Sequence, residues 1–169
     1  MDSDAVVSLE HVAGQVWMID FWATWCPPCQ APMAHNCEMI KKRKEDWGSD
    51  VRIIGLSIDG EKEKLTNHIT TKAWEDVEHY WRAESTCSKV YSVNGVPHVM
   101  IIDKTGKIVF KGHPANRPDL EADFDALRKD ETISGEGCAS ADAPADGGEA
   151  PIPEGYSEMD PKELEEDIK

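Results

Sequence analysis

Residues 22–29 read Trp22-Ala23-Thr24-Trp25-Cys26-Pro27-Pro28-Cys29, and they lie where an apolar run gives way to a helical pattern. Two cysteines separated by two residues can close a disulfide and reopen it within one helical turn. At a strand-to-helix junction, Cys26 would lie over unpaired backbone N–H groups and the positive end of the helix dipole, which favour its thiolate. A thiolate attacks disulfides and a thiol does not, so this stretch predicts thiol–disulfide exchange.

A metal site is the alternative interpretation of a cysteine pair. Structural zinc usually takes four ligands, commonly from two closely spaced pairs. The other cysteines, Cys37, Cys87 and Cys138, are scattered singly, and no His-x3–5-His pattern follows. Redox chemistry is therefore the stronger interpretation, and we expect neither a metal nor a bound cofactor.

The first 129 residues alternate between β-rich and helical patterns. Strands are expected over 15–21, 51–58, 77–81, 96–103 and 107–111, and helices over 27–47, 61–71, 84–91 and 118–129. Pro28 in the first turn and Gly48 after the last turn are typical of the ends of a helix. This order predicts an α/β fold with three α/β/α layers, a central mixed sheet, and an α-β-α insertion before the strand at 96–103.

The charge of the chain is concentrated at its end. Residues 130–169 contain 13 acidic and 2 basic side chains, whereas residues 1–129 contain 20 and 16. The composition after Lys129 is Gly, Ala, Pro, Ser and acids, which is typical of disorder. We therefore predict a domain over 1–129 and an acidic, largely disordered tail over 130–169. A short helix over 161–168 could fold on a partner, but a solvated tail is the simpler prediction.

Several function classes and locations are disfavoured by what the sequence lacks. It has no basic patch for nucleic acid and no apolar stretch approaching the ~18–20 residues that span a bilayer. The acidic start at Met1 is unlike a signal peptide, and five cysteines are too few for a disulfide scaffold. We expect a cytoplasmic protein, or an extracytoplasmic one if a leader or anchor has been removed.

Residues 5–129 resemble the thioredoxin superfamily. The active-site signature is present as Asp20-Phe21-Trp22-Ala23-x-Trp25-Cys26-x-Pro28-Cys29, Gly95-Val96-Pro97 matches the cis-proline loop, and Gly112 matches a glycine after the hairpin. Thr24, Pro27, the insertion at 74–92 and Ile102-Asp103-x-x-Gly106 are more similar to the TlpA/ResA and nucleoredoxin-like branches. The resemblance implies a thioredoxin fold and a redox-active disulfide between Cys26 and Cys29.

The resemblance also implies roles for the residues around the cysteine pair. Cys26 would be the attacking thiolate, and Cys29 the resolving thiol that breaks the mixed disulfide. Asp20 interrupts an apolar strand, where an unpaired carboxylate is costly. It would be a buried acid, with a pKa raised toward neutrality, that accepts the Cys29 proton. The alternative for Asp20 is a simple acid on an edge strand.

A substrate surface is expected beside the cysteines. Pro97 resembles the family's cis-proline, and the backbone of Val96 would then pair with an extended substrate strand. An ordinary trans proline is the alternative. Trp25 is predicted to be exposed beside Cys26 as part of the docking surface. His98 is expected to point into the sheet or the groove without a proton-transfer role.

The chain departs from the family pattern at two places. Thioredoxins usually carry a lysine near the buried carboxylate, where this chain has Gly55. The helix proline usually found five residues after the second cysteine is replaced by Ala34, and Pro32 lies two residues earlier, where it should kink or loosen the helix. Cys37 is expected to be a buried structural thiol, and Cys138 an exposed one.

The dipeptide between the cysteines predicts the direction of the reaction. Pro27 and Pro28 lack N–H groups, so two donors that would stabilise a Cys26 thiolate are missing. We therefore expect a pKa of Cys26 that is less depressed than in strong oxidants, and a reducing protein.

The leading functional prediction is a protein-disulfide reductase that acts on disulfide-containing proteins and is recharged by an electron-donating reductase or thiol. A peroxidase is disfavoured, because Thr24 lies only two residues before Cys26 and the Thr-x-x-Cys spacing fails. The alternative from another class is a thioredoxin-fold interaction module that recruits partners through its groove and acidic tail.

Overall fold

The computed structural model describes residues 9–81 and 91–138. Within them, the chain order of elements is β1 (Val16–Trp22), α1 (Pro27–Trp47), β2 (Val51–Ser57), α2 (Lys62–Lys72), β3 (Glu78–Trp81), β4 (His98–Ile102), β5 (Ile108–Gly112), the 3-10 turn η1 (Pro114–Asn116) and α4 (Leu120–Arg128). Each of these helices and strands lies within a few residues of its predicted range. The predicted helix at 84–91, Cys87 and the tail beyond Cys138 lie outside the described residues.

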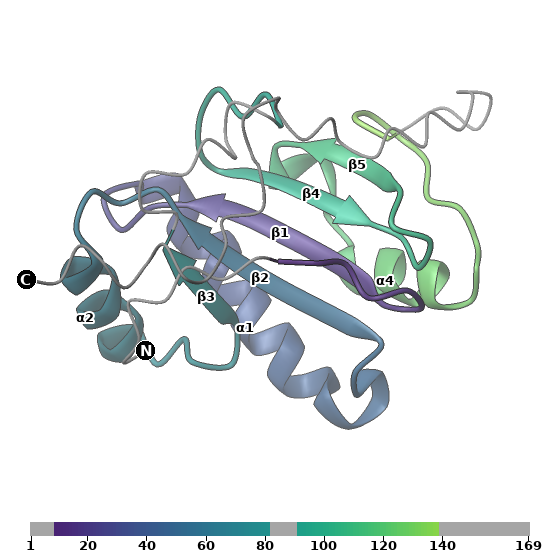
Figure 1. The fold of residues 1–169 in the computed structure, drawn as a ribbon, viewed down its shortest axis with the longest axis horizontal. Coiled ribbons are helices and arrows are strands. Elements are labelled where there is room, and N and C mark those ends of the chain that lie inside the picture. Colours follow the sequence, from purple (N-terminus) through teal and green to yellow (C-terminus); the bar gives the residue numbers. More distant parts are fainter. Residues whose placement is uncertain (1–8, 82–90, 139–169) are drawn as a thin grey trace, which may run out of the picture.

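The five strands form one mixed sheet in the order β3-β2-β1-β4-β5 (Figure 1). β1, β2 and β3 run parallel, and β4 and β5 run antiparallel to their neighbours. β1 is the central strand, and all seven of its residues are buried. Its buried position excludes an edge strand for Asp20.

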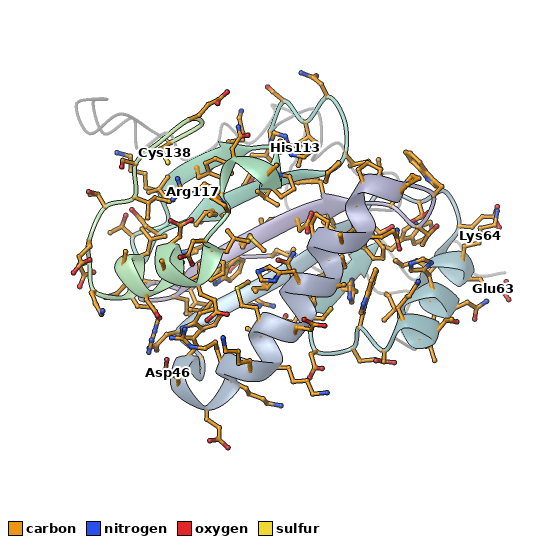
Figure 2. The ribbon with its side chains drawn as sticks, turned by 180° about the vertical axis from the view of Figure 1, so that it is seen from behind. Asp46, Glu63, Lys64, His113, Arg117 and Cys138 are labelled. Carbon is orange, nitrogen blue, oxygen red and sulfur yellow. A yellow bond between two sulfur atoms is a disulfide. The ribbon has the colours of Figure 1, made fainter. Side chains whose placement is uncertain are left out.

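The two faces of the sheet are covered differently. Alternate β1 residues Met18 and Trp22 share a core cluster with apolar residues of α1, α2 and α4. Viewed from behind, α1 and α4 lie across this face (Figure 2). The other β1 residues form a second cluster, which Leu9 and residues 91–96 help to cover. The predicted mixed α/β sheet with packed helices is therefore confirmed. Within residues 9–81 and 91–138, helices α1, α2 and α4 all contribute to the first cluster and none to the second, so these residues do not show the second helical layer of the predicted α/β/α arrangement.

Helix α1 places the cysteine pair. Cys26 is its N-cap residue, and Pro27 and Pro28 occupy its first positions, where a missing N–H costs no internal hydrogen bond. Pro32 lies inside the helix, yet the helix continues to Trp47. It ends at Gly48, whose φ of 50° is more accessible to glycine than to other residues.

The residues that follow Lys129, which the sequence analysis assigns to the tail, pack against β5 and the core as far as Cys138. The Lys111 N–H donates a hydrogen bond to the Gly137 carbonyl at 3.0 Å. The backbone of Cys138 forms an isolated antiparallel β-bridge with Phe110, on the outer edge of β5. Ile133 and Cys138 also pack against the main core. Residues 133–138 are therefore held by apolar contacts and by backbone pairing with the edge strand β5. The composition of the segment alone does not predict these contacts, because they depend on residues distant in the sequence.

Among the described residues, no helix is both long enough and apolar enough to cross a membrane.

Candidate functional site

The cysteine pair lies where β1 ends and α1 begins. Cys26 and Cys29 form a disulfide and are nearly fully buried, with 3% and 1% exposure. Next to them, Trp25 is 63% exposed, whereas Trp22 is completely buried. The two sulfur atoms are therefore almost closed to solvent, while the neighbouring aromatic ring is open to it.

Asp20 lies on the face of β1 that α1 covers, the same face that Cys29 and Met33 of α1 pack against. It is 1% exposed, and the Asn36 Nδ2 donates a hydrogen bond to its Oδ2 at 2.8 Å. Its Oδ1 has no hydrogen-bond partner among the described residues. Burial raises the pKa of Asp20 to about 8, against the smaller opposing effect of the Asn36 hydrogen bond. A carboxyl group of this pKa can exchange a proton near neutral pH.

The sheet register places Gly55 directly beside Asp20 on β2. A side chain there would meet the His79 ring, whose Nδ1 lies 2.7 Å from the position that a Cβ would occupy. His79 is paired with Gly55 from β3, and burial lowers its pKa. The space over Gly55, next to Asp20 in the sheet, is thus filled by the His79 imidazole and not by a lysine.

The Val96–Pro97 peptide bond is cis, and Pro97 is buried. Because His98 pairs with Phe21, Pro97 lies at the end of β1 from which the cysteine loop departs. The His98 ring lies edge-on to Phe21, with centroids 6.2 Å apart, on the face opposite Asp20. Burial lowers the pKa of His98, and Lys111 and His113 add to this effect.

A family comparison agrees with this geometry. The sequence model of a family described as thioredoxin-like matches residues 14–108, which is more than half of the chain. The chain belongs to the thioredoxin-like family.

Curated relatives of this thioredoxin-like chain include thiol-disulfide oxidoreductase ResA of Bacillus cereus, at 30% identity over 62% of this chain and 58% of that protein. A probable nucleoredoxin 1 of Arabidopsis thaliana is 25% identical over 75% of this chain and 24% of its own length. The chain therefore spans 58% or less of these relatives.

Solved structures show the same fold at lower identity. A protein described as a putative thiol:disulfide interchange protein DsbE, from Chlorobium tepidum, superposes with a TM-score of 0.57 at 21% identity, covering 69% of this chain and 82% of that one. A protein described as a putative thioredoxin, from Neisseria meningitidis, superposes with a TM-score of 0.59 at 19% identity, covering 69% of this chain and 77% of that one.

The thioredoxin-like site contains a set of hydrogen bonds around Asp59 that the sequence analysis did not predict. Asp59 is buried, and its carboxylate accepts hydrogen bonds from the Thr24 N–H at 3.0 Å and the Thr24 hydroxyl at 2.6 Å. The Ser57 hydroxyl donates to the same carboxylate at 2.7 Å. These bonds tie the loop before Cys26 to the end of β2. The signal available in the sequence was the pair of polar residues Ser57 and Asp59 at the end of an apolar strand.

Helix α2 forms one wall of a groove beside the exposed tryptophan. The groove has a volume of about 390 Å³ and is lined by Thr24, Trp25, Lys64, Asn67, His68 and Thr71. His68 hydrogen-bonds Gln30 at 2.8 Å, and the Gln30 amide donates to the Cys26 carbonyl at 3.2 Å. These two hydrogen bonds link His68, in the wall of the groove, to the first turn of α1.

The remaining described cysteines lie away from this site. Cys37 is buried, its Sγ is 3.7 Å from the Trp74 carbonyl oxygen, and burial is the main cause that raises its pKa to about 12. Cys37 is therefore buried, as the sequence analysis expects. Cys138 is half-buried against Arg117 (Figure 2), not fully exposed, because the segment after Lys129 packs on β5.

No cluster of three potential metal-binding side chains occurs within 9–81 and 91–138.

Proposed function

We propose that the protein is a thiol–disulfide oxidoreductase that reduces disulfide-containing proteins through Cys26 and Cys29. The observation that carries the proposal is the disulfide at the N-terminus of α1, with the exposed Trp25 next to Cys26 in the chain and the buried Asp20 under the same helix. The family and its ResA and nucleoredoxin relatives support the same chemistry.

In the reduced protein, the Cys26 thiolate attacks one sulfur of a substrate disulfide. The substrate S–S bond breaks, a Cys26–substrate S–S bond forms, and the other substrate sulfur leaves as a thiolate. The first turn of α1 supports this step because its peptide dipoles favour a negative charge at Cys26.

The second step releases the substrate. The Cys29 thiol gives its proton to Asp20, and the resulting thiolate attacks Cys26. The Cys26–Cys29 bond forms while the second substrate sulfur leaves reduced. Asp20 supports this role because its pKa of about 8 leaves a fraction ionised near neutral pH.

Substrate docking would use Trp25 and the Val96–Pro97 loop. An extended substrate segment could pair with the backbone of Val96 while its apolar side chains contact Trp25. Support comes from the exposure of Trp25 and from the position of Pro97 at the end of β1. The cycle then needs an electron-donating reductase or thiol to restore the dithiol.

The proposed direction of the reaction is reductive. Pro27 and Pro28 both stand in the first positions of α1, so neither contributes an N–H to a Cys26 thiolate. We expect the Cys26–Cys29 couple to have a reduction potential of about −270 mV, the thioredoxin value. Equilibration in glutathione or dithiothreitol redox buffers measures it, and a value near about −120 mV would instead indicate a disulfide donor.

Substitution of single cysteines tests the activity. Cys26→Ser should abolish reduction of a disulfide-containing protein such as insulin, and Cys29→Ser should accumulate a mixed disulfide that a non-reducing gel detects. Cys138→Ser is the matched control and should retain wild-type rates. Full activity in Cys26→Ser would refute the proposed function.

A partner for the acidic tail and a cytoplasmic location stay predictions. Deletion of 139–169 followed by affinity capture tests the partner, and fractionation of the native source tests the location.

A further inference from the structure

A buried asparagine on α1 holds the buried carboxyl group of Asp20. We propose that Asn36 is a positioning residue, which holds Asp20 through one oxygen and leaves the other oxygen to take the Cys29 proton. This inference rests on the proposed function, and it assigns a role to a residue that packing alone does not explain.

The helix geometry brings Asn36 and Cys29 to the same side of α1. Seven residues at 100° per residue bring the side chain back to within about 20° of its starting direction. Cys29, Met33 and Asn36 accordingly all face the sheet and are buried. Asp20 on β1 lies under this face, so one rigid helix carries both the proton donor Cys29 and the group that orients the acceptor.

Of the four polar side-chain atoms of Asp20 and Asn36, two form a hydrogen bond and the other two lack a partner among the described residues. Asn36 Nδ2 donates to Asp20 Oδ2 at 2.8 Å, while the buried Asp20 Oδ1 and Asn36 Oδ1 have no hydrogen-bond partner among the described residues. Buried unpaired oxygens destabilise a fold. A leucine has a similar volume and would bury no polar atom, so the amide is best explained by what it does to Asp20.

The hydrogen bond has a definite effect on the charge of Asp20. A donor stabilises the ionised carboxylate, and the bond from Asn36 opposes the increase in pKa that burial causes. Removing the donor should therefore raise the pKa of Asp20 further. At pH 7 a smaller fraction would then be ionised, and proton transfer from Cys29 would be slower.

The other titratable groups around Asp20 do not account for a carboxyl titration near pH 8. On α1, the Cys37 thiol has a pKa of about 12. On β3, His79 lies across Gly55 and has a lowered pKa, whereas Val99 faces Asp20 from β4 and is apolar. The buried Asp123 of α4 is paired with Arg117. A carboxyl carbon resonance that titrates near pH 8 in the oxidised protein, where Cys26 and Cys29 are bonded, is therefore assigned to Asp20.

The test is the titration of Asp20 itself, followed by carboxyl carbon NMR in the oxidised full-length protein. Asn36→Leu should raise the midpoint by about one pH unit, the size expected for one hydrogen bond to a charged group. Asn36→Ala is measured as well, in case the leucine variant does not fold. Asn36→Gln, which keeps an amide donor, should move the midpoint back toward the wild-type value.

Met39→Leu is the matched control, since Met39 is buried on the same helix and has no polar contact to lose. It should leave the midpoint unchanged. In the reduced protein, the pH dependence of mixed-disulfide release should shift upward with the titration, and release at pH 7 should slow by up to about tenfold.

A wild-type midpoint in both Asn36→Leu and Asn36→Ala would overturn the proposal. An altered midpoint with an unshifted pH profile of release would also overturn it, because Asn36 would then affect a carboxyl group that release does not use. The NMR titration requires no turnover, so a failure of the reductase activity, seen with Cys26→Ser, is distinguished from a failure of this inference.

Discussion

Helix α1 contacts carboxyl groups at two places along its length, and their surroundings shift the pKa in opposite directions. At Asn36, in the middle of the helix, Asp20 is buried with one amide donor and no cation among the described contacts. At the far end, near Asp46 in Figure 2, Arg43 contacts three carboxylates. Burial raises the pKa of Asp20 to about 8, whereas the contacts with Arg43 lower the pKa values of Glu121 and Asp125.

The far end is a paired network that joins α1 to α4. The Arg43 guanidinium donates to Glu121 at 3.0 Å and Asp125 at 2.8 Å, and it lies 4.7 Å from the centre of the Trp47 ring. Burial would raise the pKa of Asp125, but the hydrogen bonds from Arg43 and Trp47 outweigh this and lower it. These carboxylates stay ionised and hold two helices together.

The difference shows what makes an acid reactive in this fold. A carboxylate paired with an arginine gives up its proton at low pH and is fixed in one charge state at neutral pH. A carboxyl group buried beside an amide is destabilised when ionised, so its proton is exchangeable near pH 7. Ionisation of Asp20 therefore lowers the stability of the fold, whereas ionisation of the carboxylates around Arg43 increases it.

The largest expected effect comes from replacing the buried acid. The unfolded chain releases the Asp20 proton near pH 3.8, whereas the folded protein keeps it to about pH 8. Stability therefore falls as pH rises through this window, and Asp20→Asn should raise the free energy of unfolding by about 2–4 kcal/mol at pH 7. Urea denaturation measures this gain, which should disappear below about pH 4.

Asp125→Asn is the matched substitution at the far end of α1, and its stability change should have the opposite sign. Equal effects of the two variants would contradict the comparison. Asp20→Asn should also slow mixed-disulfide release and remove its pH dependence near 8, because the amide cannot accept the Cys29 proton.

The space beside Asp20 can be tested by filling it. In Gly55→Ala the new Cβ would lie 2.7 Å from the His79 Nδ1 and 3.1 Å from the Trp22 Nε1. Overpacking of this kind typically costs about 1–3 kcal/mol, so the midpoint of thermal unfolding should fall. Gly60→Ala is the control, because no atom lies within 4 Å of its added Cβ. An unchanged midpoint in Gly55→Ala would show that His79 yields freely.

The smallest effect is expected at the paired network. Arg43 keeps 18% of its side chain exposed, and Arg43→Met should lower the free energy of unfolding by about 1 kcal/mol at pH 7. The hydrogen bonds from Lys42 and Arg43 also lower the pKa of Glu121. Since these folded-state pKa values are depressed, the difference should be lost as pH falls below about 4.

Lys42→Met is the matched control for this network, because Lys42 also contacts Glu121 but is 68% exposed. Denaturation at pH 7 and pH 3 should show a smaller loss for Lys42→Met than for Arg43→Met. An Arg43→Met effect that persists unchanged at pH 3 would mean that the arginine acts by packing on Trp47 alone.

Local patterns in the sequence predicted much of this molecule. The strand-to-helix junction at 22–29, the alternation of elements and the single acid in an apolar strand predicted the fold, the cysteine pair and the burial of Asp20. Each of these features depends on residues close together in the chain, where the period of the apolar positions and the chemistry of the N-cap are directly visible.

The tertiary structure alone decided which groups meet the site. Asn36 lies 16 residues from Asp20, and Asp59 lies 35 from Thr24. The His79 ring fills the space over Gly55, which separates β1 from β3 in the sheet. The segment up to Cys138 is likewise held by the free edge of β5. These contacts depend on strand register and on the rotation of α1 over the sheet, which no local pattern specifies, because register and rotation are set by the packing of the whole core.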